Sequence, residues 1–191
     1  LTNLAFIIAS LFGWRLAAWR KRLSGEIKLL LALAAAIGVG SFLFHTLATE
    51  ATKWLDLLPI FLYQLWFLWI YARRFLHWRP DTASAFVVSF FCIMLAAQFL
   101  PTRWLNGSLS YAPAFVVLLC LGIHHYQTAR QERWLLLAAV ACFSIALVFR
   151  SIDTAVCEQF PLGTHFLWHL CNGGLIYLTL RAAILDKLVT T

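Results

Sequence analysis

The chain contains seven apolar stretches, each close to the length that a helix needs to cross a membrane. A helix that spans the hydrocarbon core needs roughly 20 apolar residues, and fewer where it is packed against protein. Short polar or helix-breaking connectors separate the stretches, for example at residues 20–25 and 79–81. The stretches cover residues 3–19, 27–46, 56–72, 83–100, 111–126, 134–150 and 163–185.

The composition agrees with a protein that folds in lipid. Hydrophobic residues make up 62% of the 191 positions and charged residues only 12%, which is too few polar groups to cover a soluble globule of this size. No connector is long enough to form a second domain. We therefore predict an all-α fold: one integral membrane domain over residues 1–191, built as a bundle of seven transmembrane helices.

The basic residues are distributed unevenly between alternate connectors. With seven spans, three of the fifteen Lys and Arg residues fall on one side, Lys53, Arg103 and Arg150, while the eight acidic residues divide evenly. The other twelve fall on the opposite side: Arg15, Arg20, Lys21, Arg22, Lys28, Arg73, Arg74, Arg79, Arg130, Arg133, Arg181 and Lys187.

A bias in Lys and Arg without a bias in acids is the signature of membrane topology. It predicts an N-terminus outside and a C-terminus in the cytoplasm. The net charge of +7 is then explained by topology, so we expect no nucleic-acid partner.

Three histidines fall at helix ends that this topology places on the extracytoplasmic side. His45 ends the second stretch, and His165 and His169 open the seventh. Ionisable groups at membrane depth are costly, so their gathering at one level indicates a function. Ser41, Asp56 and Asp153 fall at the same level. The polar groups His77, His124, His125 and Glu132 fall at the opposite ends, where ordinary interfacial placement explains them.

The spacing of these residues predicts a zinc site. His165 and His169 are four apart and share one helix face, and Ser41 lies one turn from His45. Three neutral nitrogens leave a tetrahedral zinc one open position, as in catalytic sites. Asp56 would then transfer protons, and Ser41 would bond a developing oxyanion. Gly38 and Gly40 would let neighbouring helices approach closely at this depth.

Simpler explanations exist for each piece. Ser41 can bond back to its own helix, Asp56 can cap a helix that has Pro59 in its first turn, and the glycines can serve packing alone. A rival ligand is haem, held by His45 and either His165 or His169. Haem would leave Ser41 and Asp56 without a role, and a Soret band in the absorption spectrum would identify it.

The motifs that carry these residues resemble the alkaline ceramidase family. They are Gly38-Val-Gly-Ser-Phe-Leu-Phe-His45-Thr, Asp56-Leu-Leu-Pro59, Ile152-Asp153 with Cys157-Glu158, and His165-Phe-Leu-Trp-His169. That family belongs to a superfamily of seven-helix membrane hydrolases. The resemblance runs over nearly the whole chain and implies a zinc-dependent amidase that splits ceramide into a fatty acid and a sphingoid base. It implies zinc ligands at His45, His165 and His169, a serine beside the metal at Ser41, and an acid–base aspartate at Asp56.

The chain departs from the family pattern at its start. Relatives carry an acidic segment before the first span, with calcium ligands and a cysteine that pairs with the counterpart of Cys157. This sequence opens at Leu1 without that segment. We expect the natural chain to carry further N-terminal residues, so calcium is a possible second metal whose expected ligands are absent from this sequence.

The prediction is therefore a multi-pass membrane zinc amidohydrolase that acts on ceramide or another N-acyl lipid, with its site toward the extracytoplasmic side. One alternative is a lipid-remodelling esterase of the same superfamily. Another is a seven-helix receptor or carrier in which zinc is structural.

Overall fold

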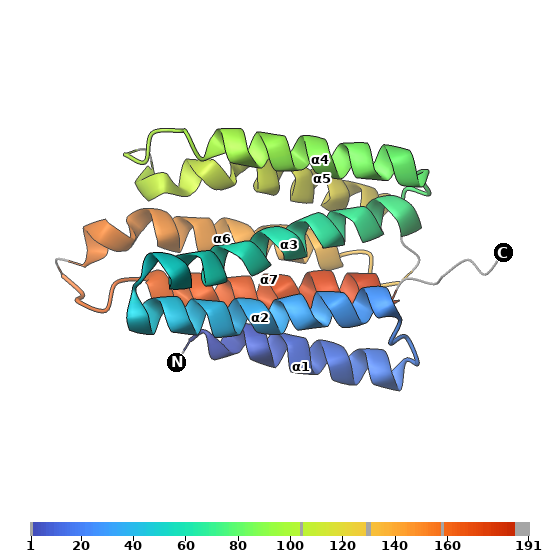
Figure 1. The fold of residues 1–191 in the computed structure, drawn as a ribbon, viewed down its shortest axis with the longest axis horizontal. Helices are drawn as coiled ribbons and strands as arrows, with labels where there is room; N and C mark the ends of the chain where they lie inside the picture. Colours follow the sequence, from blue (N-terminus) through green and yellow to red (C-terminus); the bar gives the residue numbers. More distant parts are fainter. Residues whose placement is uncertain (1, 104, 129–130, 158, 186–191) are drawn as a thin grey trace.

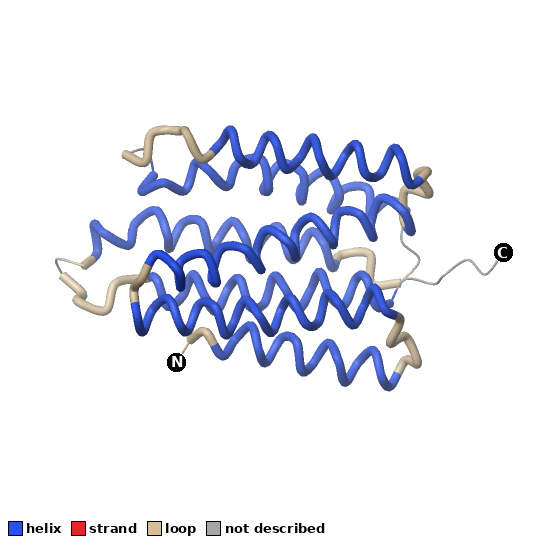
Figure 2. The backbone as a smooth tube through the Cα atoms, viewed as in Figure 1, coloured by secondary structure: helices blue, strands red, loops and turns tan. Residues whose placement is uncertain are grey.

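In the computed structural model, long helices run side by side along one direction (Figure 1; Figure 2). The structure describes residues 2–103, 105–128, 131–157 and 159–185, so Arg130 and Lys187 of the charge count lie outside it. Within these ranges there are seven α-helices, one 3-10 segment and no strand. The elements are α1 (Leu4–Trp19), α2 (Gly25–Leu47), α3 (Glu50–Arg74), α4 (Pro80–Ala97), η1 (Leu105–Tyr111), α5 (Ala112–Thr128), α6 (Leu135–Val156) and α7 (His165–Leu185).

Each predicted stretch coincides with one of these helices, so the all-α architecture is confirmed. The largest differences are that α6 runs on to Val156 and that α3 begins at Glu50, six residues before the predicted start. Thr49 caps α3 and forms a reciprocal capping box with Thr52, which stabilises a helix start among polar residues. Asp56 therefore lies inside the helix, and its interpretation as a helix cap is wrong.

Not every helix has the character of an independent membrane span. Among the described residues, five segments are long and apolar enough to cross a membrane: α2, α3, α4, the run Leu105–Thr128 and α6. α1 is apolar but has only 16 residues. α7 is not one of the five, and it carries polar side chains such as His169, Asn172 and Arg181. The membrane bundle is thus supported, while the count of seven spans and their orientation stay predictions.

Six helices form a closed ring around the centre of the bundle. Each helix from α2 to α7 packs against its neighbours in chain order, and α7 closes the ring against α2. α1 lies outside and packs on α2 and α7 (Figure 1). The C-terminal ends of α2 and α6 and the N-terminal ends of α3 and α7 lie together at the left-hand end of that view. This end brings together residues that are far apart in the sequence.

α3 is fixed within the ring by hydrogen bonds from its aromatic side chains. Tyr63 shares a hydrogen bond of 2.8 Å with Thr179 of α7, and Trp66 donates to the carbonyl of Glu26 at the start of α2. Tyr71 donates to the carbonyl of Leu121 in α5. Because buried polar groups are costly unless they are bonded, these contacts specify the position of α3 against three other helices.

At the opposite end of the bundle, an ion pair joins the connector between α5 and α6 to α7. Arg181 donates from both Nε and Nη2 to the carboxylate of Glu132, and its Nη1 donates to the Tyr177 hydroxyl at 3.1 Å. The hydrogen bonds from Arg181 hold the pKa of Glu132 below its ordinary value of 4.5. The pair is therefore stronger when Glu132 is charged.

A carboxylate whose pKa falls on folding stabilises the protein above its unfolded pKa, and this contribution disappears as the pH falls through the folded value. We expect Glu132→Gln to lower the melting temperature in detergent by roughly 1–3 °C at pH 7. The difference from the wild type should shrink as the pH falls below 4.5 and vanish below the lowered pKa of Glu132. Glu50→Gln is the control, because the Glu50–Lys53 pair is exposed within a single helix. If Glu132→Gln lowered the melting temperature equally at pH 7 and at the acidic pH, the charge of Glu132 would not be the source of the stability.

Candidate active site

His45, His165 and His169 meet at the end of the bundle that Figure 1 shows on the left. One ring nitrogen from each lies within 4.8 Å of the others. The ring centroids are 5.2 Å apart for His45 and His165, 4.9 Å for His45 and His169, and 4.7 Å for His165 and His169. The predicted juxtaposition of α2 and the start of α7 is therefore present in the structure, and this set of nitrogens could hold a metal ion.

Asp153 positions the start of α7, which carries two of these histidines. Its Oδ1 accepts hydrogen bonds from the backbone N–H groups of Thr164, at 2.6 Å, and His165, at 3.0 Å. Such bonds satisfy amides that have no partner inside the helix. Gly163 has a φ of +58°, and a Cβ there would overlap the Asp153 carboxylate. Asp153, which the sequence placed at the level of the site, thus serves as a helix cap.

The second oxygen of Asp153 faces the cluster. Oδ2 lies 4.0 Å from Nδ1 of His165. At this distance the two groups interact electrostatically without a hydrogen bond. Asp153 therefore places a negative charge beside His165 as well as capping the backbone that carries it.

His169 is the most enclosed of the three rings. It is buried, its Nδ1 lies 3.3 Å from the Thr2 hydroxyl, and its ring packs against Phe6 of α1. Asn3 reaches the same region, where its Oδ1 accepts a hydrogen bond of 3.5 Å from Ser41. Sequence reasoning missed Thr2 and Asn3, because nothing near them in the chain indicates contact with residues 38 to 167 positions away.

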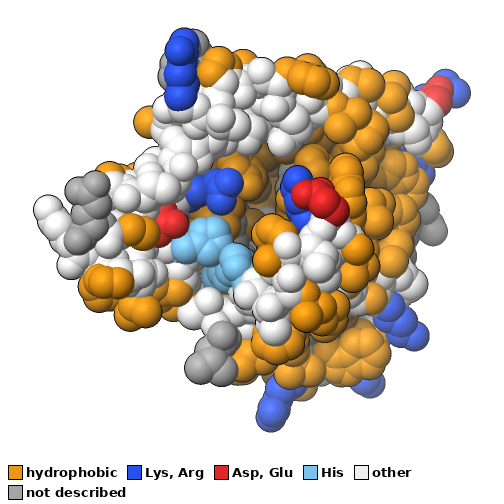
Figure 3. All heavy atoms as spheres, turned by 60° about the vertical axis from the view of Figure 1, so that its left-hand side comes forward, with side chains coloured by type: hydrophobic (Ala, Val, Ile, Leu, Met, Phe, Trp, Pro, Cys, Tyr) orange, Lys and Arg blue, Asp and Glu red, His pale blue; other side chains and the backbone are white. Residues whose placement is uncertain are grey.

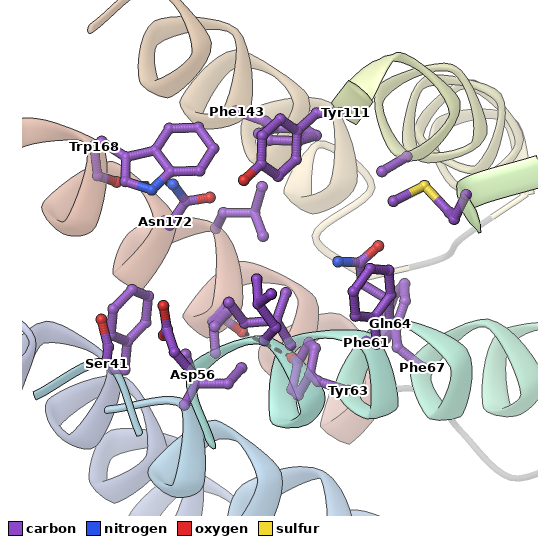
Figure 4. A pocket seen from close by; sticks show the side chains of 18 of the residues that line it. Ser41, Asp56, Phe61, Tyr63, Gln64, Phe67, Tyr111, Phe143, Trp168 and Asn172 are labelled. Carbon is purple, nitrogen blue, oxygen red and sulfur yellow. Dashed lines mark hydrogen bonds between the residues drawn. The ribbon is translucent and has the colours of Figure 1, made fainter. Parts of the chain in front are cut away.

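Ser41 and Asp56 face the same cavity from α2 and α3. Ser41 is only 3% exposed, and its hydroxyl and the Asp56 carboxylate are close enough to interact. Figure 4 shows both side chains pointing into the cavity. Asp56 and His45 are also close enough to interact electrostatically. The structure therefore brings Ser41 and Asp56 together beside the histidines.

Gly40 allows this arrangement, because α2 and α3 are closest there. A Cβ at Gly40 would overlap the backbone carbonyl of Leu55, the residue before Asp56. At Gly38 a Cβ would lie 2.7 Å from the Ile7 side chain of α1. The prediction that these two glycines permit close helix packing is confirmed.

A long, mostly apolar cavity runs from the histidines into the bundle. Its volume is about 360 Å³, within the usual range of ligand sites. Along α3 it extends from Lys53 to Leu68, which corresponds to about 22 Å of helix rise. Phe61 and Phe67 lie toward its inner part, away from Ser41 (Figure 4). The cavity thus has a polar head and an apolar body.

Figure 3 shows the mouth of this cavity, with histidine side chains at its base and basic side chains on both sides. The cavity-lining residues that sequence reasoning assigned no role include Tyr111, Arg150, Trp168 and Asn172. Figure 4 shows Tyr111, Trp168 and Asn172 on the side of the cavity opposite Ser41 and Asp56. No local pattern connects them, since they come from η1, α6 and α7.

The histidines at the other end of the bundle do not join the cluster. His77 is exposed, and Nδ1 of His124 lies 3.0 Å from the Tyr71 hydroxyl. His125, in the last turn of α5, is only 2% exposed and packs against Phe75, so it lies inside the protein and does not face solvent. His124 and His125 thus have roles in packing.

The model of the ceramidase family matches residues 1–190, almost the full sequence. The chain belongs to the ceramidase family. Searches of curated proteins and of solved structures found no match. Membership in the ceramidase family supports ceramide hydrolysis by a membrane protein, and the histidine cluster lies at the head of a cavity suited to a lipid.

We expect Gly40→Ala to separate Ser41 from Asp56, because the added methyl group forces α2 and α3 apart. Overpacking of this kind costs about 1–3 kcal/mol. The variant should unfold at a lower temperature in detergent and should lose most of its ceramide hydrolysis. Gly174→Ala is the matched control, since the nearest atom to a Cβ there is the Cys142 sulfur at 3.8 Å. Wild-type activity in Gly40→Ala would show that the close approach is dispensable.

Proposed function

We propose that the protein is a membrane-embedded zinc amidohydrolase that cleaves the N-acyl amide bond of ceramide-like lipids. The observation that carries the proposal is the cluster of His45, His165 and His169 at the polar head of a long apolar cavity. We further propose that residues 1–190, the extent of the family match, form one catalytic domain whose site faces the extracytoplasmic side.

The three histidines fit a zinc ion better than haem. Catalytic zinc sites commonly use three protein ligands and leave one position for water or substrate. Haem needs two axial rings on opposite faces of a macrocycle, whereas all three ring centroids here lie within 5.2 Å of one another. Zinc bound there would act as a Lewis acid toward a carbonyl and would lower the pKa of water to about 7.

Ser41 and Asp56 supply the remaining chemistry. Attack of water on the amide carbonyl places negative charge on the carbonyl oxygen, and the Ser41 hydroxyl can donate a hydrogen bond to it. Asp56 accepts the proton that the water loses and delivers it to the amide nitrogen as the C–N bond breaks. The products are a carboxylic acid and a free amine, and Asp56 returns to its starting state.

The cavity can hold the substrate in the required orientation. Its apolar body, lined by side chains such as Phe61, Phe67 and Phe90, takes a hydrocarbon chain away from water. The amide then lies at the depth of Ser41, next to the histidines. Positioning of this kind accelerates a reaction because the reacting groups no longer have to meet by diffusion.

The central test is hydrolysis by the purified protein together with its metal content. We expect about one zinc per chain by elemental analysis and release of fatty acid from ceramide. A matched acyl ester separates the amidase from the lipid-remodelling esterase. Absence of fatty acid release from either lipid, with zinc bound, would favour a receptor or carrier with structural zinc.

His45→Ala and His169→Ala should each abolish turnover and lose zinc, because two imidazoles bind the ion much more weakly than three. Zinc content and hydrolysis are measured on the same preparations. His77→Asn is the control, since His77 is exposed, lies outside the cluster, and has a φ of +55° that asparagine tolerates. Full zinc occupancy in both alanine variants would refute the assignment of the ligands.

Asp56→Asn should keep zinc and lose rate, because an amide cannot accept the proton from water. General acid–base catalysis typically contributes 10²- to 10⁴-fold, so we expect kcat to fall by about that factor. The measurements are kcat, KM and zinc content. Unchanged kcat in this variant would remove Asp56 from the proton-transfer step.

A further inference from the structure

Arg150 places a positive charge in the wall of the catalytic cavity. It lies near the end of α6, and its guanidinium carbon is 5.2 Å from the centre of the Tyr111 ring and 5.3 Å from that of Trp168. The two rings belong to η1 and α7, so aromatic side chains from two further elements contact the cation. Its charge acts on both His165 and His169. The cation is therefore part of the site and close to the histidines.

The surroundings of Arg150 hold it in place. Asn106 of η1 donates a hydrogen bond of 3.0 Å to the backbone carbonyl of Arg150, and Ser151 donates to the Ser108 hydroxyl at 2.9 Å. These contacts fasten η1 to α6 and keep Tyr111 against the guanidinium group. Contacts between a cation and the faces of aromatic rings stabilise the charge through the quadrupole of each ring. The position of the guanidinium group is thus specified by the fold.

The charge of Arg150 is not neutralised within the described part of the chain. No acidic side chain there forms an ion pair with it, and its buried Nε has no hydrogen-bond partner. Asp153, three residues further on, uses Oδ1 to cap α7 and directs Oδ2 to His165. A half-buried cation without a counterion is costly, which indicates that a ligand supplies the negative charge.

Lys53 provides an instructive contrast, because it is the other basic residue that lines the cavity. Its ammonium group lies 3.4 Å from the Glu50 carboxylate one turn earlier in α3, and both side chains are substantially exposed. The charge of Lys53 is already balanced and solvated. Arg150 is therefore the cavity's candidate for binding an anion.

We propose that Arg150 binds the carboxylate of the fatty acid formed in the cavity. This inference rests on the proposed function, in which a neutral amide and water give a carboxylic acid and an amine. The acid then passes its proton to the amine or to water and becomes a carboxylate. Guanidinium and carboxylate groups form paired, charge-assisted hydrogen bonds. Arg150 thus recognises a charge that exists only after the C–N bond is broken. It makes the free fatty acid a tight product ligand and an inhibitor of turnover.

The test measures binding of radiolabelled palmitate and of palmitamide, its neutral counterpart, to the purified zinc-loaded protein in detergent. A hydrogen bond to a charged group contributes about 1.5–3 kcal/mol, or roughly 10- to 100-fold in affinity. We expect Arg150→Gln to weaken palmitate binding by at least tenfold and palmitamide binding by less than twofold. Arg150→Lys should be intermediate, because it keeps the charge and loses the paired geometry.

Lys53→Gln is the matched control and should leave palmitate affinity unchanged. Melting temperature and zinc content report whether each variant is folded. Equal palmitate affinity in the wild type and Arg150→Gln would overturn the proposal. It would also be overturned if Arg150→Gln lost affinity for palmitate and palmitamide by the same factor. These outcomes are separate from the test of the proposed function. If palmitate binding depends on Arg150 but the protein does not hydrolyse ceramide, only the amidase is overturned. If ceramide is hydrolysed and Arg150→Gln binds palmitate as the wild type does, only this inference is overturned.

Discussion

The close contact between α2 and α3 at Gly40 is the constraint on which the site depends. α2 carries Ser41 and His45, and α3 carries Asp56, so their chemistry requires two backbones to approach more closely than any Cβ would allow. Once these helices are in contact, α7 needs only to pack against α2 to bring His165 and His169 to the same place. Capping by Asp153 then sets where α7 begins. A glycine and a carboxylate thus determine the geometry of side chains that are themselves far apart in the chain.

Much of the fold was predictable because lipid imposes simple rules on sequence. Every apolar stretch became a helix, since backbone groups in hydrocarbon must satisfy one another within the segment. The early start of α3 was missed because Glu50 and Lys53 interrupt the apolar pattern, although Thr49 and Thr52 carry the local capping signal. Hydropathy locates the part of a helix that lies in lipid, whereas capping decides where the helix begins.

The histidine cluster was predictable for the same reason, and its surroundings were not. His165 and His169 share a helix face by spacing alone, and topology places His45 at the same level. Contacts such as Tyr111 with Arg150, or Thr2 with His169, depend on how irregular segments fold over the ends of the helices. Neither the hydrophobic periodicity of the sequence nor a local motif predicts these contacts. The sequence therefore predicts the candidate metal ligands more readily than the residues that hold them in place.

The position of α1 links this helix to the candidate site. This helix lies outside the ring and contributes none of the clustered imidazoles, yet the residues at its start touch the innermost ring and the buried serine. A shift of α1 along its neighbours would disturb both contacts at once. A helix on the periphery of the bundle is thereby coupled mechanically to the most deeply placed groups of the reaction centre.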